Sequence, residues 1–252
     1  GEFIKIQGFR VLGYEIGISV EAPYCEVIYN YLERNWNGIK VGPGQANGAI
    51  IRRNTTLNSS HSGIYLKNNH GLFVEDNTVA RSSLNALRDA WSGGLKWNFV
   101  RFSLFRNNVV LNTGDIRVPG SCNPWGALWG DCWAKLNMIS GNTLNANGWV
   151  ALYVEWGQGQ QQVLYNAGSN NRFGLAFRGS EYSIAAKNVF INNDISFCLF
   201  PGNTKNNIMR KNLFIGDGKA LQRDYNDEKD AQKQLTNVLD DNVWSKSHDW
   251  EQ

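Results

Sequence analysis

Two acidic residues at matching places in neighbouring sequence repeats are the best candidates for chemistry. Asp131 ends the segment 127–131 (ALWGD), and Glu155 ends the segment 151–155 (ALYVE), which starts 24 residues later. Seven of the ten tryptophans lie between Trp91 and Trp156, around this pair. Two carboxyl groups among aromatic rings are typical of sites that cleave glycosidic bonds, because one carboxyl donates a proton while the other attacks the sugar or activates water.

Aromatic and basic side chains near the acids are candidates for binding the sugar. Aromatic rings offer an apolar face on which a sugar ring stacks, and cationic groups bind hydroxyls or balance the carboxylates. The predicted substrate-binding residues are Tyr65, Trp91, Lys96, Trp125, Trp129, Tyr153, Trp156 and Arg178.

The two acid-bearing segments belong to a repeat of the form Gly-apolar-x-apolar-x, in which Ala replaces Gly in some copies. The copies begin at residues 17, 38, 63, 94, 127, 151, 174 and 197, so the intervals are 21, 25, 31, 33, 24, 23 and 23 residues. A second series consists of asparagines that follow an apolar residue by three places: Asn30, Asn54, Asn77, Asn108, Asn142, Asn166, Asn188 and Asn212. Both series lengthen at the same two places, which indicates loops inserted at 80–93 and 113–125 into a regular repeat.

Short alternating strands without a helix in each repeat exclude leucine-rich and ankyrin units. The repeat predicts an all-β fold, a single-stranded right-handed parallel β-helix of about eight coils over residues 1–216. The asparagines would then form an internal ladder of stacked side-chain amides. Residues 217–252 are predicted to form a tail with a short helix that starts near Asn226, and this helix would place Ala231, Leu235, Val238 and Leu239 on one face against the solenoid.

Strand alternation directs the two x positions of each repeat outward, toward solvent. Asp131 and Glu155 would then be neighbours on adjacent coils, with backbones about 4.8 Å apart. Like charges at this separation raise the pKa of one carboxyl, and Arg178 on the next coil could keep the other ionised. The alternative is a pair of solvated acids balanced by Lys96 and Arg178.

Several tryptophans have other expected positions. The inserted loops would wall the face that carries the acids, with Trp91 and Trp125 on them. Trp97 occupies an inward position, and Trp133 and Trp149 could also belong to the core.

The segments ALWGD and ALYVE, one coil apart, resemble those of the β-helical β-xylosidase-type glycoside hydrolases, within the wider class of pectate-lyase-like carbohydrate-active proteins. The resemblance implies retention of anomeric configuration, with Asp131 as nucleophile and Glu155 as acid/base. The leading hypothesis is therefore a retaining glycoside hydrolase that acts on a polysaccharide or oligosaccharide.

Two other functions remain open. A polysaccharide lyase on the same scaffold would hold Ca²⁺ with the acids and use Lys67, Lys96 or Arg178 as the base. A non-catalytic solenoid would bind glycans or build a larger structure. Apart from Ca²⁺ in the lyase alternative, no cofactor or metal is expected.

The net charge and the lengths of the apolar runs set further limits on the function. A net charge of +3 is too small to suggest nucleic-acid binding, and no apolar run is long enough to span a membrane. No signal peptide is visible, yet a polysaccharide substrate favours a secreted or cell-surface protein.

Cys122 and Cys132 either close the loop between them as a disulfide or remain thiols. Because residues 3–9 look like the interior of a coil, we expect a partner chain or a further segment to cover them.

Overall fold

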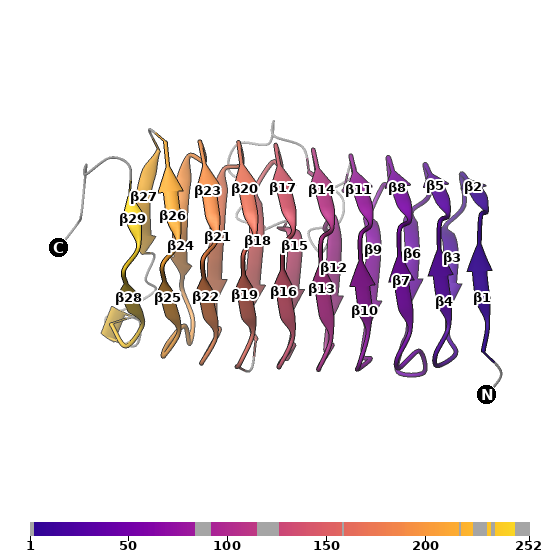
Figure 1. The fold of residues 1–252 in the computed structure, drawn as a ribbon, viewed down its shortest axis with the longest axis horizontal. Coiled ribbons are helices and arrows are strands. Elements are labelled where there is room, and N and C mark those ends of the chain that lie inside the picture. The colour runs from indigo at the N-terminus through magenta and orange to yellow at the C-terminus, as the bar shows by residue number, and fades with distance from the viewer. Residues whose placement is uncertain are drawn as a thin grey trace.

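The computed structural model describes residues 3–83, 92–114, 126–157, 159–216, 218–223, 231–232 and 235–244. The chain forms an all-β parallel solenoid whose coils contribute short strands to three sheets (Figure 1). This confirms the predicted parallel β-helix. The three sheets, which we name A, B and C, contain ten, ten and nine strands.

Sheet A consists of β1 (Lys5–Gln7), β4 (Glu26–Ile28), β7 (Ile50–Arg52), β10 (Phe73–Glu75), β13 (Leu104–Arg106), β16 (Met138–Ser140), β19 (Gln162–Leu164), β22 (Ile184–Ala186), β25 (Ile208–Arg210) and β28 (Val238–Asp240). Sheet B consists of β2 (Arg10–Leu12), β5 (Tyr31–Glu33), β8 (Thr55–Leu57), β11 (Thr78–Ala80), β14 (Val109–Leu111), β17 (Thr143–Asn145), β20 (Ala167–Ser169), β23 (Val189–Ile191), β26 (Leu213–Ile215) and β29 (Val243–Trp244). Sheet C consists of β3 (Ile16–Val20), β6 (Asn37–Val41), β9 (Ser62–Lys67), β12 (Leu95–Asn98), β15 (Gly126–Asp131), β18 (Val150–Glu155), β21 (Phe173–Arg178), β24 (Ile195–Phe200) and β27 (Lys219–Arg223).

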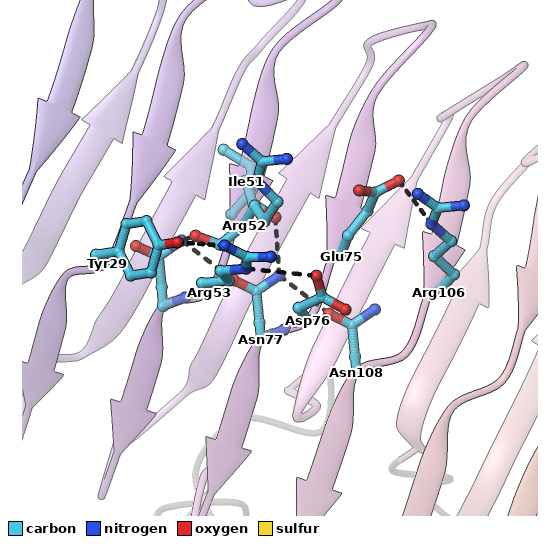
Figure 2. Close-up of polar contacts among 10 residues, drawn as sticks. Tyr29, Ile51, Arg52, Arg53, Glu75, Asp76, Asn77, Arg106 and Asn108 are labelled. Atoms are coloured by element: carbon cyan, nitrogen blue, oxygen red, sulfur yellow. Dashed lines mark hydrogen bonds and ion pairs between the residues drawn. The ribbon is translucent and has the colours of Figure 1, made fainter.

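The predicted asparagine ladder is present at the corner between sheets A and B. In each step an asparagine Oδ1 accepts hydrogen bonds from the backbone N–H and the side-chain amide of the asparagine one coil before it. Figure 2 shows one such step, in which Asn77 Nδ2 donates to Asn108 Oδ1 at 3.0 Å and to the Ile51 carbonyl at 2.8 Å. The ladder runs from Asn30 to Asn212 as predicted and continues to Asn242.

Two further asparagine columns, which we did not predict, occupy the other corners. Asn147, Asn171 and Asn193 are bonded to one another in the same way, and Asn207 donates to Asn237 Oδ1 at 2.9 Å in a third column. A sequence signal for the second column exists, because each of these three asparagines follows an asparagine of the first ladder by five residues. Asparagine side chains therefore link successive coils at all three corners.

The predicted C-terminal helical tail is wrong for residues 238–244, which form strands. Val238 and Leu239, placed on one face of a helix, instead lie in β28, which pairs in parallel with β25. Trp244 in β29 stacks on Phe214 with ring centroids 4.2 Å apart. This segment forms strands because the edges of sheets A and B offer unpaired backbone groups, with which a further strand forms hydrogen bonds.

The start of the predicted helix, residues 224–230, lies outside the described residues. The Leu235 N–H donates to the Ala231 carbonyl at 3.3 Å, which is a single helical turn. The division of the chain at residue 216 stays a prediction. At the opposite end, β1 and β2 are edge strands with Phe9 and Tyr14 exposed, and the predicted covering partner or segment also stays a prediction.

Replacing Asn108 with Ala is expected to lower the free energy of unfolding by at least ~2 kcal/mol, because it leaves the buried backbone N–H of Asn77 without an acceptor. Chemical denaturation followed by circular dichroism measures this change. Asn145→Ala, which removes an acceptor from the half-exposed Ser169, serves as the control and should cost less than ~1 kcal/mol. Equal losses in the two variants would contradict a structural role for the ladder.

Candidate active site

Four adjacent strands of sheet C position the predicted catalytic pair. Asp131 ends β15 and Glu155 ends β18, and the register places Trp129 opposite Tyr153 and Glu155 opposite Arg178. The pairing of β12 with β15 sets Lys96 beside Trp129. Parallel strands in register therefore bring acids and bases from four coils onto one stretch of sheet, as the repeat spacing predicted.

These side chains leave the sheet on the side opposite the solenoid core. Leu128, Leu152 and Val154 belong to the interior cluster, whereas Trp129 and Tyr153 belong to a separate outer cluster with Val150, Phe173, Ala176 and Cys198. The outward direction follows from strand alternation.

The expected solvent exposure is wrong. Asp131 is 1% exposed and Glu155 is 3% exposed, and Lys96 is equally buried. Alternation fixes only the direction in which a side chain leaves its strand, and burial depends on what lies above it.

The buried polar groups are paired with one another. Lys96 Nζ lies 3.1 Å from Asp131 Oδ2 and 3.2 Å from the centroid of the Trp129 ring. Trp129 Nε1 donates to Glu155 Oε2 at 3.1 Å, and Arg178 Nη1 donates to Glu155 Oε1 at 3.1 Å. Two acids and two bases thus form one compact group, which offsets the cost of burying their charges.

The two carboxyl groups have different surroundings. Burial raises the pKa of Glu155 to about 7, and the nearby Asp131 carboxylate adds to this rise while Arg178 opposes it. Asp131 instead faces the Lys96 ammonium directly. The pKa of Lys96 is lowered, since burial outweighs the attraction of Asp131. Burial also raises the pKa of Tyr153 well above its ordinary value. At neutral pH, Glu155 can therefore both give and take a proton.

An open groove of about 520 Å³ lies beside the pair, where the chain leaves sheet C. Trp133 and Trp156 line it and are 51% and 46% exposed, and Tyr182 and Glu181 complete its wall. Trp156 packs against Gly179, where a Cβ would lie 2.5 Å from the ring, so glycine is needed for the ring to lie flat there. The Arg178 guanidinium carbon lies 5.8 Å from the centroid of the Trp156 ring and so links the groove to Glu155.

Some of the other predicted binding residues lie in the described sheet, and others lie outside the described residues. Tyr65 lies in β9 opposite Lys96, in the predicted column, with its ring against His61. Trp91 and Trp125 lie outside the described residues, as does most of the two inserted loops. Trp97 is fully buried and stacks on Phe105, as expected of an inward position. We missed Trp133 and Tyr182 as groove residues, and each follows a strand or bridge of the repeat.

Metal and disulfide chemistry find little support in the described part of the chain. No group of three or more His, Cys, Asp or Glu side chains there could hold a metal ion. Cys132 is a free thiol, which argues against the disulfide alternative, and Cys122 lies outside the described residues. Burial raises the pKa of Cys132 to about 12, and Asp131 contributes to the rise, so this thiol is not an activated nucleophile.

The solved structures of similar fold include two epimerases. One is the periplasmic alginate epimerase AlgG (TM-score 0.57, 14% identity), and the match covers 87% of this chain and 50% of that chain. The other is the A-module of the Azotobacter vinelandii mannuronan C-5 epimerase AlgE4 (TM-score 0.59, 14% identity), with 96% of this chain and 76% of that chain covered. The chain thus spans half the length of the AlgG structure, and at this identity the likeness shows the fold alone.

No protein-family model and no curated protein matches the sequence. Neither of these two epimerase structures is a β-xylosidase-type hydrolase, and the closer relationship to that type is not supported. Within the described residues, no helix is long and apolar enough to cross a membrane.

The stability of the protein is expected to depend on the proton at Glu155. The folded state holds this proton up to a pKa of about 7, whereas the unfolded chain releases it near 4.5. The free energy of unfolding should therefore fall as the pH rises between these values. Glu155→Gln removes this dependence, so its stability relative to the wild type should rise by roughly 3 kcal/mol between about pH 4 and pH 8.

Denaturant unfolding at a series of pH values measures this difference. Glu21→Gln, at an exposed position, is the control that leaves Glu155 in place. A stability difference between Glu155→Gln and the wild type that stays constant across the window would show that the Glu155 pKa is not raised.

Proposed function

We propose that this chain acts on a polysaccharide or oligosaccharide as a retaining glycoside hydrolase, with Asp131 as nucleophile and Glu155 as acid/base. The observation that carries the proposal is that two carboxyl groups on adjacent coils have different surroundings. Lys96 faces Asp131, while burial raises the pKa of Glu155 to about 7. Glycosidases need this division, because one carboxyl must hold a proton while the other carries negative charge.

The strand register favours retention over inversion. Adjacent parallel strands lie about 4.8 Å apart, and retaining enzymes hold their carboxyl groups about 5–5.5 Å apart. Glu155 gives its proton to the glycosidic oxygen as Asp131 attacks the anomeric carbon, which breaks the glycosidic bond and forms a glycosyl ester. Glu155 then takes a proton from water as the water oxygen attacks the same carbon and releases Asp131.

The groove lined by Trp133 and Trp156 is the proposed entry for the sugar. Its exposed rings offer stacking faces, and Arg178 connects it to Glu155. Because Glu155 is 3% exposed, a productive complex requires Arg178 to move off the carboxyl as the sugar arrives. The side chain of Arg178 is 35% exposed, so it has room to turn toward the groove.

A polysaccharide lyase is the second candidate. Burial lowers the pKa of Lys96, which is a property of an amine that acts as a base near neutral pH. The two structures of similar fold are named as epimerases of alginate and mannuronan, which supports a polysaccharide substrate without selecting between the chemistries. The predicted Ca²⁺ has no candidate site among the described residues. With either chemistry, a polymeric glycan favours a secreted or cell-surface protein.

Asp131→Asn is expected to abolish turnover, with a loss of at least ~10³-fold in kcat, because the nucleophile is lost while the fold is kept. Glycan fragments incubated with the wild type identify the substrate, and proton NMR of the first product gives the anomer. Retained configuration with an inactive Asp131→Asn variant supports the hydrolase. Unsaturated products would replace it with the lyase, and a fully active, folded variant would exclude Asp131 from the chemistry.

Trp156→Ala is expected to raise KM by about tenfold with a smaller effect on kcat, since an aromatic platform contributes up to ~1.5 kcal/mol to binding. Phe102→Ala is the control, because Phe102 is also an exposed aromatic residue at a turn (61% against 46% for Trp156) and has a similar left-handed backbone, with φ of 52° against 45°. Initial-rate kinetics on the cleaved oligosaccharide separate KM from kcat. Equal KM values in the two variants would place the sugar outside this groove.

A further inference from the structure

A second groove lies at the corner between sheets A and B, away from the carboxyl pair. It has a volume of about 440 Å³. Leu164 and Ile184, on the outer side of sheet A, belong to its apolar floor, and Tyr165, Lys187 and Lys211 stand on its rim. The three rim residues occupy one structural column, since each directly precedes an asparagine of the first ladder, and their φ angles are 58°, 57° and 55°.

The same column holds different residues, with different contacts, nearer the N-terminus. There it holds Tyr29, Arg53 and Asp76, and Figure 2 shows Arg53 bonded both to the Tyr29 hydroxyl and to Asp76. Beside this column, Arg106 pairs with Glu75 at 2.9 Å. Arg53 and Arg106 each pair with an acid in this part of the corner.

Three bases border the second groove. Lys187 and Lys211 succeed one another on adjacent coils, and Arg210 borders them. None of these three bases lies within 4.0 Å of a carboxylate among the described residues, although on the next coil Asp240 lies opposite Arg210 and Asp241 follows Lys211 in the column. Lys187 Nζ donates to the Tyr165 hydroxyl at 3.0 Å and lies 5.2 Å from the ring centroid, so an ammonium and an exposed ring are held side by side.

We propose that this groove binds an acidic polysaccharide, one that carries a carboxylate on each sugar. The ring of Tyr165 offers a stacking face for a sugar, and the adjacent ammonium groups offer charge-assisted hydrogen bonds to carboxylates. Because the coils repeat at about 4.8 Å, the bases form a regular row that suits a linear polymer with regularly spaced charges. Three bases on a chain of net charge +3 are too few for nucleic acid, which is bound through many phosphate contacts.

The site is independent of the proposed cleavage, so it can be tested in a Glu155→Gln background in which turnover is blocked. Calorimetry with oligogalacturonate should show binding that weakens with added salt, whereas the methyl-esterified oligomer, which has the same chain without charge, should not bind. Lys187→Gln with Lys211→Gln should weaken binding by about tenfold for each lost charge-assisted hydrogen bond.

Arg81→Gln is the matched control, because Arg81 is an exposed base with a similar φ of 53° that lies outside the groove. Oligogalacturonate binding that is kept in Arg81→Gln and lost in the double variant supports the site. Equal binding of the charged and esterified oligomers, equal affinity of the double variant and the control, or tighter binding of a single-stranded DNA oligomer would each overturn the proposal. None of these results depends on whether Asp131 and Glu155 cleave a glycoside.

Discussion

The in-register stacking of parallel strands is the constraint on which the rest of this structure depends. Each residue of a coil lies next to its equivalent in the coils before and after it, at the spacing of one strand. An inward polar side chain at a corner therefore finds its partners in the equivalent residues of the neighbouring coils and in backbone groups. Asparagine suits this position because its amide carries both a donor and an acceptor, and Asn77 and Asn108 use both in the same step.

The same stacking brings charged groups together whether or not this is favourable. Asp131 and Glu155 occupy equivalent places on neighbouring coils, and both are buried on the outer side of sheet C. Lys96 and Arg178 on the flanking coils compensate part of the cost, and the rest appears as the raised pKa of Glu155. A scaffold selected for stability alone would gain more from apolar residues at these four places, which is a reason to regard the group as functional.

The corner between sheets A and B shows two results of stacking charged groups on successive coils. Arg53 is stacked between Tyr29 and Asp76, and its charge is satisfied there. Lys187 and Lys211 occupy equivalent positions on adjacent coils, and their positive charges repel one another. A ligand with negative charge would relieve this repulsion. Variation along a single column of the repeat can in this way create separate binding surfaces on one regular scaffold.

The spacing of the repeat was sufficient to predict the solenoid, the first asparagine ladder and the adjacency of Asp131 to Glu155, because period and strand alternation are local properties of the sequence. The helical tail was mispredicted because Val238 and Leu239 suit either a helix face or an edge strand, and only the free edge of sheet A decides between them. The sequence also could not predict that the outward acids are buried or that Trp133 is exposed. Those properties depend on how side chains such as Lys96, Trp129 and Arg178 pack against one another, which neither the repeat period nor strand alternation specifies.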